Sequence, residues 1–358
     1  MNTHPLIDDP RPWAFTRAGL TAGLRAYAND ATLVIKDLYE MTIPFRRPAV
    51  GRIRWLNAAC DSAHGKKFFR LVVKEPQGST RTGTAGAGLR EVSFYRNLAE
   101  QIPVSIPRLL ASQPDGAWLI MEMLPLERKP ESWAASDYLK AIEQLVVLHD
   151  RFWGLGADLA AYPWLARPLT SDHAIYIQAA TTGMRKLSDD SSSYLLSRDP
   201  TLLSMIKRLI EHADQIAAAL RSAPATLLHG DYWPGNITQS FENDFIVYDW
   251  QLASIGPGVL DLSHFIQSSQ WYFNPLPVTS QELIAEYRSR LSNTSRFSWE
   301  DSDWAALWDY ALLWNFLINW VDMLVNIPAS VLHTQYPLLC SLWLDPVSAA
   351  ITRRLPGD

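Results

Sequence analysis

The chain has 358 residues, and its 32 Lys and Arg against 37 Asp and Glu give a formal net charge of −5. Hydrophobic residues make up 48% and charged residues 19%, which excludes a disordered chain, and the length fits about two domains. The acidic balance disfavours a nucleic-acid partner, and two distant cysteines, Cys60 and Cys340, exclude both a disulfide framework and a cysteine zinc site.

No segment has the pattern of a signal peptide or a membrane span. Residues 1–11 are polar and contain prolines, without the apolar region of a signal peptide. The most apolar stretch, residues 305–327, contains four polar residues, which disfavour a transmembrane helix: Asp309, Asn315, Asn319 and Asp322. We therefore expect a cytoplasmic protein with no membrane partner.

The N-terminal part is expected to contain one helical region and two strands. The first forty-odd residues are predicted helical because apolar side chains recur there at helical intervals: Leu33, Ile35, Leu38 and Met41. Residues 51–60 and 67–75 are predicted as strands, joined by a turn-rich connector over 61–65.

A Gly-, Thr- and Ser-rich loop over 78–88 follows, and a helix is predicted from Leu89 onward. Residues 118–124 are predicted as another buried strand, after which Pro125 and Pro130 mark a linker. We place the boundary there, with a β-rich N-lobe over 1–125 and a C-lobe over 126–358.

The C-terminal part is expected to be mainly helical, interrupted by short strands and turns over 226–262. The predicted helices cover residues 138–153, 202–220, 283–291 and 304–325. The predicted fold class is therefore α+β, with a small β-rich lobe and a larger helical lobe.

One segment carries a specific chemical pattern, H-G-D-x-x-x-x-N, from His229 through Asp231 to Asn236. Thirteen residues later comes Asp249, after a predicted hairpin of strands 236–240 and 245–248 that would return it beside Asn236. In kinases the first Asp of such a pattern accepts the proton of the acceptor hydroxyl. The Asn and the second Asp hold Mg²⁺, which prefers oxygen ligands.

The H-G-D form resembles that of the aminoglycoside phosphotransferases, choline kinases and their relatives. The following D-W-Q triplet and the G-P-G and D-L segments, at 249–251, 256–258 and 261–262, look most like the ecdysteroid-kinase-like branch. The resemblance implies a two-lobed protein-kinase-like fold that transfers the γ-phosphoryl group of ATP or GTP to a hydroxyl of a small organic acceptor. It also implies that His229 and Asp261 support the catalytic loop.

Two upstream residues complete the kinase pattern. Lys74 ends a predicted strand, and Glu91 follows seventeen residues later within an R-E-x-x-F-Y-R run that the family shares. We expect Lys74 to hold the α- and β-phosphates and Glu91 to hold Lys74, the alternative being that both are solvated surface charges. By analogy, the carbonyl of Glu122 and the amide of Leu124 would bind adenine, unless 118–124 is an ordinary core strand.

The pattern departs from kinases in one respect, because no G-x-G-x-x-G loop precedes the lysine strand. The glycines at 78–88 come after Lys74 and are interpreted as a flexible connector, so what covers the phosphates is unassigned. The motifs of P-loop NTPases, serine hydrolases and zinc proteases are absent from the sequence.

The acceptor would contact the C-lobe. On the predicted helix 304–325, Asn315, Asn319 and Asp322 share a sector. They either bond to neighbouring helices or face a cavity for a hydroxylated ligand. Trp233, Trp271 and Tyr272 could wall such a cavity, since twelve of the 15 tryptophans follow residue 126, although a large helical core would give the same bias.

The tryptophans favour a bulky alcohol of low charge over a polycationic aminoglycoside, which would need a carboxylate-rich pocket. The acidic segment 300–303 is instead interpreted as a helix start.

Two alternatives to a small-molecule kinase were considered. A non-catalytic kinase-fold protein that binds a nucleotide or another ligand would not need the complete Lys, Glu, Asp, Asn, Asp set. Phosphorylation of a protein is disfavoured because 249–258 leaves no room for a long activation segment. The sequence does not indicate the oligomeric state.

Overall fold

The computed structural model describes residues 13–41, 51–76, 85–124, 129–189, 194–239, 244–295 and 297–356. The chain divides into two compact units. Unit 1 comprises Met1–Glu127 and Thr238–Leu252, and unit 2 comprises Arg128–Ile237 and Ala253–Asp358. The predicted lobe boundary at 125/126 lies outside the described residues. The α+β fold class is confirmed, with a small antiparallel sheet in one unit and mostly helices in the other.

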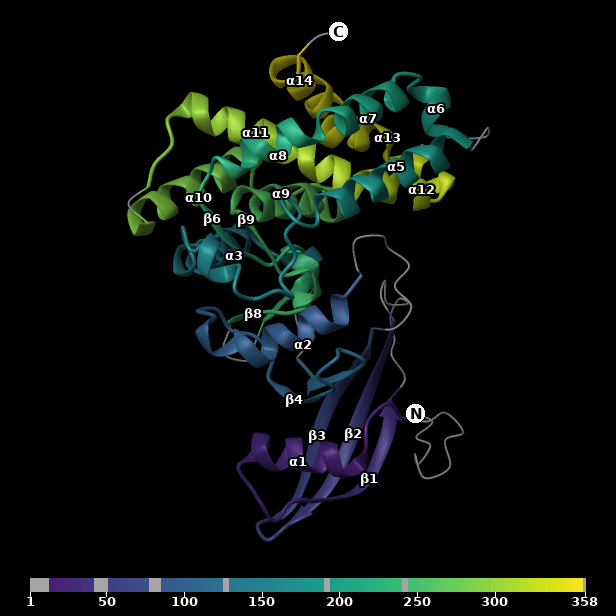
Figure 1. Ribbon diagram of the computed structural model, residues 1–358. Helices are drawn as coiled ribbons and strands as arrows, with labels where there is room; N and C mark the ends of the chain where they lie inside the picture. Colours follow the sequence, from purple (N-terminus) through teal and green to yellow (C-terminus); the bar gives the residue numbers. More distant parts are fainter. Residues whose placement is uncertain are drawn as a thin grey trace. The chain divides into compact units, whose positions relative to one another are not determined.

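Unit 1 is built on a five-stranded antiparallel sheet with the strand order β1-β2-β3-β5-β4 (Figure 1). Its strands are β1 (Val34–Met41), β2 (Arg52–Ser62), β3 (Gly65–Glu75), β4 (Leu109–Ser112) and β5 (Leu119–Glu122). Its helices are α1 (Arg17–Ala28), α2 (Ala87–Asn97) and the 3₁₀ turn η2 (Ala99–Gln101).

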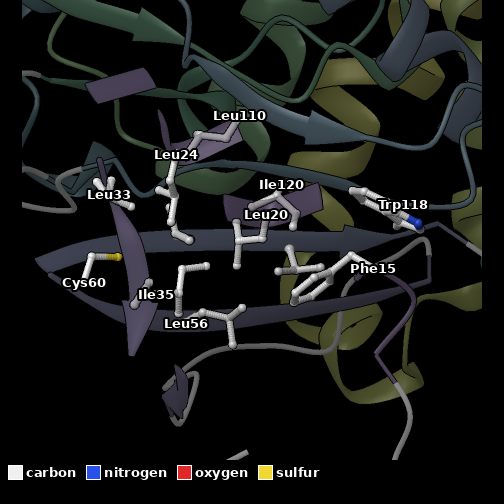
Figure 2. Packing of buried hydrophobic residues seen from close by; sticks show 13 residues of the cluster. Phe15, Leu20, Leu24, Leu33, Ile35, Leu56, Cys60, Leu110, Trp118 and Ile120 are labelled. Atoms are coloured by element: carbon white, nitrogen blue, oxygen red, sulfur yellow. The ribbon is translucent and has the colours of Figure 1, made fainter. Parts of the chain in front are cut away.

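The hydrophobic core of unit 1 lies between α1 and one face of this sheet (Figure 2). Alternate residues of each strand point into it because side-chain direction in a strand has a period of two. The core residues include Leu20 and Leu24 of α1 and Ile35, Leu56, Cys60, Leu71, Val73 and Ile120 of the strands. The two strands predicted at 51–60 and 67–75 are thus confirmed as β2 and β3.

Of the helical region predicted over the first forty-odd residues, Arg17–Ala28 is confirmed as α1, but the helical prediction is wrong for Val34–Met41, which is strand β1. Helix α1 ends at Ala28, where Asn29 takes the left-handed conformation with φ 48° and stops it. A short apolar run fits both the helical and the strand period. Here backbone pairing with β2 selects the strand.

The helix predicted from Leu89 is confirmed as α2, although it begins at Ala87 and Leu89 itself is exposed. The strand predicted at 118–124 is confirmed as β5. Most of the predicted glycine-rich loop, residues 77–84, lies outside the described residues, whereas Gly86 and Gly88 belong to the start of α2.

Unit 2 is mainly helical (Figure 1). The predicted helix 202–220 is two helices, because the backbone breaks at His212. The helices are α3 (Ala135–Arg151), α4 (Gly156–Leu159), α5 (His173–Asp189), α6 (Tyr194–Arg198), α7 (Leu202–Glu211), α8 (Ala213–Arg221), α9 (Val259–Phe273), α10 (Ser280–Ser295), α11 (Asp301–Asn315), α12 (Val321–Asn326), α13 (Ala329–Leu339) and α14 (Asp345–Arg354).

Short elements complete the chain. Strand β6 (Ala225–Leu228) pairs antiparallel with β9 (Ser254–Pro257), and β7 (Ile237–Gln239) pairs with β8 (Phe245–Val247). The 3₁₀ turns are η3 (Pro130–Ser132), η4 (Pro234–Asn236) and η5 (Trp250–Leu252), and the π-helices are η6 (Phe316–Trp320) and η7 (Cys340–Leu344). The predicted hairpin at 236–248 is therefore present, although its tip, 240–243, lies outside the described residues.

The predicted helix 304–325 consists of α11, η6 and α12 in direct succession. It is buried along most of its length, as expected for a helix that is apolar nearly all round. Within the described ranges, no helix is both long and apolar enough to cross a membrane.

Candidate active site

In unit 1, three predicted site residues meet around one ammonium group. The Lys74 Nζ on β3 donates to the Glu91 Oε1 at 2.6 Å and to the Asp249 Oδ1 at 2.8 Å. The Lys74 side chain is 13% exposed and that of Glu91 only 1%. The alternative that both are solvated surface charges is therefore wrong.

The charges in this cluster do not balance, because one ammonium faces two carboxylates. Burial by itself would lower the pKa of Lys74, but Asp249 and Glu91 outweigh it and hold the pKa above its usual range. Burial raises the pKa of Glu91 to about 7, against the opposing effect of Lys74. Lys74 therefore stays charged, and its ammonium is shared between the carboxyl groups of Glu91 and Asp249.

Helix α2 supports Asp249 as well as supplying Glu91. Asp249 has φ 70°, a left-handed conformation that is uncommon outside glycine and needs support from its neighbours. The Arg90 Nη1 donates to the carbonyl of Gln251 at 2.8 Å, and the rings of Phe94 and Trp250 stack with centroids 4.1 Å apart. The R-E-x-x-F run therefore puts three residues on one helix: Glu91, which binds Lys74, and Arg90 and Phe94, which hold the segment that carries Asp249.

The predicted adenine-binding strand ends at Leu124, the last described residue before 125–128. The amide of Met123 donates to the carbonyl of Arg70 on β3 at 3.0 Å. Because the carbonyl of one residue and the amide of the next point to opposite edges of a strand, the Glu122 carbonyl points away from β3. The Glu122 side chain accepts hydrogen bonds from the Tyr27 hydroxyl and the Arg108 amide, both at 2.8 Å.

In unit 2, two donors hold the carboxylate of Asp231. The Asn236 Nδ2 donates to the Asp231 Oδ2 at 2.8 Å and to its carbonyl at 2.9 Å, and the His264 Nε2 lies 2.9 Å from the Asp231 Oδ1. Burial alone would raise the pKa of Asp231, but hydrogen bonds from His264 and Asn236 and the nearby His229 hold it below its usual range. Asp231 is therefore ionised near neutral pH, and His264 is the donor.

Asp261 braces the backbone of the catalytic loop from the first turn of α9. Its Oδ2 accepts from the amide of His229 at 2.7 Å, and its Oδ1 accepts from the amide of Gly230 at 2.9 Å. The His149 Nε2 lies 3.3 Å from the Asp261 Oδ2, and the His149 Nδ1 lies 2.8 Å from the Tyr287 hydroxyl. Gly230 has φ 83°, which its place in this tight turn requires.

The residues predicted for the acceptor fall into two groups. Asn315 is buried, and its Nδ2 donates to the Leu260 carbonyl at 3.0 Å and to the Ser263 Oγ at 2.6 Å, which joins α11 to α9. The Asn319 Nδ2 lies 3.5 Å from the Asn315 Oδ1, and the Asp322 carbonyl accepts from Asn326 within α12. Among these three, Asn315 thus takes part in a bond between helices.

The two tryptophans predicted for the acceptor site also differ, since Trp271 is buried and Trp233 is half-buried. Trp271 is 6% exposed and packs edge-on against Trp320 in the core. Trp233 is half-buried, and its ring lies 4.9 Å from that of Tyr272, which is 45% exposed, and 6.1 Å from that of Phe273. A side chain on Gly235 would meet the Trp233 ring at 2.3 Å, so the glycine allows this packing.

Sequence reasoning missed several residues of the site: Arg90, Phe94, His149 and His264. His264 was detectable in principle, because it lies three residues after Asp261 and therefore on the same face of a helix. The other three were hidden because their partners are distant in the sequence.

The oxygen ligands suit a hard divalent cation. Because the Asn236 amide nitrogen donates to Asp231, its oxygen is the atom left to bind a cation, and Asp249 offers a carboxylate. Within the described part of the chain, no three His, Cys, Asp or Glu side chains gather as a complete metal site. A magnesium ion bound to either residue would need further oxygens from a ligand such as a phosphate.

One solved structure supports this fold, and two others are similar at lower scores. An aminoglycoside phosphotransferase from Alicyclobacillus acidocaldarius superposes with a TM-score of 0.52 at 17% identity, over 97% of this chain and 98% of that chain. A type VIII aminoglycoside-3'-phosphotransferase gives 0.47 at 18% identity, over 82% and 97%. A choline kinase from Streptococcus pneumoniae gives 0.49 at 10% identity, over 92% and 95%.

The sequence comparisons identify the family. No curated protein matches the chain. Residues 57–299, more than half of the chain, match the model of the phosphotransferase enzyme family. The match does not distinguish the ecdysteroid-kinase-like branch, which stays a prediction. The match spans Lys74, Glu91, Asp231, Asn236 and Asp249, and the chain therefore belongs to the phosphotransferase enzyme family.

Proposed function

We propose that the protein transfers the γ-phosphoryl group of ATP or GTP to a hydroxyl of a small organic acceptor. The observation that carries this proposal is the bridge of Lys74 to both Glu91 and Asp249. Such a bridge supplies a fixed positive charge for phosphate oxygens, with the Asp249 side chain beside it. The ionised Asp231 in unit 2 supplies the base.

Each residue then has a defined task. Lys74 binds the α- and β-phosphates, Glu91 keeps it oriented, and the Glu122 carbonyl and Leu124 amide bind the base of the nucleotide. Asp231 accepts the proton of the acceptor hydroxyl as its oxygen bonds to the γ-phosphorus. The bond from that phosphorus to the β–γ bridging oxygen breaks, and the nucleoside diphosphate leaves.

His229 and Asp261 act on the loop that carries the base. Two backbone amides, those of His229 and Gly230, are fixed by one buried carboxylate, so the position of Asp231 is set before an acceptor binds.

Asn236 and Asp249 would hold Mg²⁺ through their oxygens. When bound, the ion neutralises charge on the phosphates of the nucleotide. This fits a cluster in which two carboxylates share one ammonium.

We further propose that the acceptor is a bulky alcohol of low charge. Trp233 lies two residues after Asp231, and its ring packs with Tyr272 and Phe273 on a partly exposed aromatic surface. An aromatic surface favours a flat, apolar body, whereas an aminoglycoside would need carboxylates to match its ammonium groups. Trp271, Asn319 and Asp322 stay weaker candidates, and Asn315 already has partners.

A nucleotide-consumption screen against a diverse alcohol library, read by the mass shift of the product, tests this function. We expect turnover with steroid-like or macrolide-like alcohols and its loss in Asp231→Ala, with an unchanged circular dichroism spectrum. Turnover confined to polycationic sugars would refute the acceptor class. Magnesium-dependent nucleotide binding without phosphoryl transfer to any alcohol would favour the non-catalytic alternative.

A further inference from the structure

We propose that His264 is a positioning residue for the catalytic base: it fixes the plane of the Asp231 carboxylate and so directs one oxygen at the acceptor hydroxyl. This rests on the proposed function, in which Asp231 accepts the acceptor proton. His264 lies outside the H-G-D motif, whose histidine is His229.

Two donors, His264 and Asn236, each contact one oxygen of the Asp231 carboxylate, and we call this arrangement the clamp. The His264 Nε2 lies 2.9 Å from the Asp231 Oδ1, and the Asn236 Nδ2 donates to the Oδ2 at 2.8 Å. Two donors on separate oxygens remove the rotation of the carboxylate about its last bond, which is otherwise broad. Each carboxylate oxygen has two lone pairs, so one site on each oxygen stays open for a hydroxyl.

The Asp231 carboxylate stays partly exposed to solvent in this clamp. The Asp231 side chain is 27% exposed and that of His264 is 16% exposed. An acceptor can therefore reach the carboxylate while His264 holds it from the protein side.

Helix α9 makes the clamp rigid. Its first turn carries Asp261, which binds the backbone amides at 229 and 230, and His264 lies on the same face one turn later. The same helix is tied to α11 by Asn315, which donates to the Leu260 carbonyl and the Ser263 hydroxyl. One helix thus holds both the backbone and the reactive side chain of the catalytic loop.

A neighbouring serine raises a different reading, that of a hydrolytic Ser-His-Asp triad. The Ser268 Oγ lies 3.5 Å from the His264 Nε2, the same nitrogen that contacts Asp231. A triad needs the carboxylate and the serine on different ring nitrogens, so that the proton can pass through the ring. The arrangement here fits a donor aimed at Asp231 and does not fit a triad.

The test compares His264→Leu, which removes the donor, with His264→Gln, whose amide nitrogen can replace the Nε2 donor. Gln270→Ala is the matched control, because Gln270 lies about 120° around the axis of α9 from His264 and also loses one hydrogen bond, to Ser280. ADP release from MgATP is measured with water alone, which reports hydrolysis, and with the best alcohol from the screen, which reports phosphoryl transfer. Circular dichroism and melting temperature confirm folding.

We expect His264→Leu to lower kcat about tenfold or more while the KM for MgATP stays within about twofold, because the nucleotide is held elsewhere. His264→Gln should recover most of kcat, and Gln270→Ala should match the wild type. A wild-type kcat in His264→Leu, or an equal loss in His264→Gln, would overturn the proposal.

A second measurement separates this proposal from the proposed function. The ¹⁵N shift of the His264 Nε2 is recorded in the wild type and in Asp231→Ala, and we expect it to change. An unchanged shift would overturn the clamp whether or not the enzyme is active. A wild type that forms no ADP under any condition, with the shift still sensitive to Asp231, would instead refute the proposed function.

Discussion

Asp261 shows how much of the catalytic loop depends on one buried carboxylate. It accepts two backbone amides of the loop and contacts His149, and its side chain is 2% exposed. Burial alone would raise the pKa of Asp261, but the hydrogen bond and charge of His149 and the nearby His229 hold it below the usual value of 3.8. The loop is therefore stabilised by the ionised form.

The sign of this pKa shift predicts a pH dependence. A carboxyl whose folded-state pKa is lowered adds stability above its usual pKa, and that stability is lost as the pH falls through the folded-state pKa. We expect Asp261→Asn to lower the free energy of unfolding by about 2–4 kcal/mol at pH 7. Urea denaturation at pH 7 and at pH 3 should show this difference shrinking at the lower pH, and a constant difference would contradict the assignment.

At the scale of single residues, the sequence predicted which side chains come together better than it predicted what holds them. The spacing of Lys74 and Glu91 was sufficient to predict their pairing, because phosphate binding needs these groups, whereas the contact of Lys74 with Asp249 was not predicted. His149 was missed because its partners lie far away in the sequence, and His264 was missed although its spacing from Asp261 puts both on one face of a helix.

At the scale of elements, α2 connects the two carboxylates that face Lys74. Arg90 and Phe94 support the segment 249–252, and Glu91 lies between them on the helix. Loss of the Phe94 ring would leave a cavity beside Trp250, which is fully buried.

We therefore predict that Phe94→Ala lowers both stability and activity. The cost of removing a buried phenylalanine is about 3–5 kcal/mol, and the released Trp250 would let Asp249 shift. Leu98→Ala is the control, since Leu98 is equally buried at the end of α2. Comparison at equal folded fraction should show a lower kcat in Phe94→Ala only, and equal kcat values would mean that the stack is not needed to place Asp249.

The errors at this scale have a common cause. The segment Val34–Met41 was predicted as helix and is strand β1, and 202–220 is two helices. In both places the local apolar pattern fits more than one structure, and pairing with β2 or packing of a second helix decides.

At the scale of the whole molecule, binding of a nucleotide should stabilise the folded state. A ligand at 100 times its Kd adds about 2.7 kcal/mol to the free energy of unfolding if it binds only the folded chain. We expect MgATP to raise the melting temperature of the wild type, and EDTA to remove most of this increase.

Two lysines of strand β3 provide the matched comparison. Lys74→Met removes the ammonium between Glu91 and Asp249, whereas Lys67→Met removes one that pairs with Asp30 at 2.9 Å. The MgATP-dependent increase should vanish in Lys74→Met and persist in Lys67→Met. An equal increase in both variants would show that Lys74 does not bind the nucleotide.

The tryptophan excess has a divided explanation. Seven of the twelve tryptophans that follow residue 126 are buried, and five of these lie in helical elements of unit 2: Trp271, Trp304, Trp314, Trp320 and Trp343. Trp233 differs because it lies on the catalytic loop and packs with a partly exposed tyrosine. Composition could not separate these uses, since packing and ligand contact require the same side chain.

The sequence by itself determined the fold class, the family and the pairing of Lys74 with Glu91. It could do so because phosphate and cation chemistry restricts which residues occur at which spacing. Only the tertiary structure decided that Val34–Met41 pairs as a strand, that Asn315 is used between helices, and that His264 contacts Asp231. Those outcomes depend on contacts between residues far apart in the chain, and local patterns carry no record of such contacts.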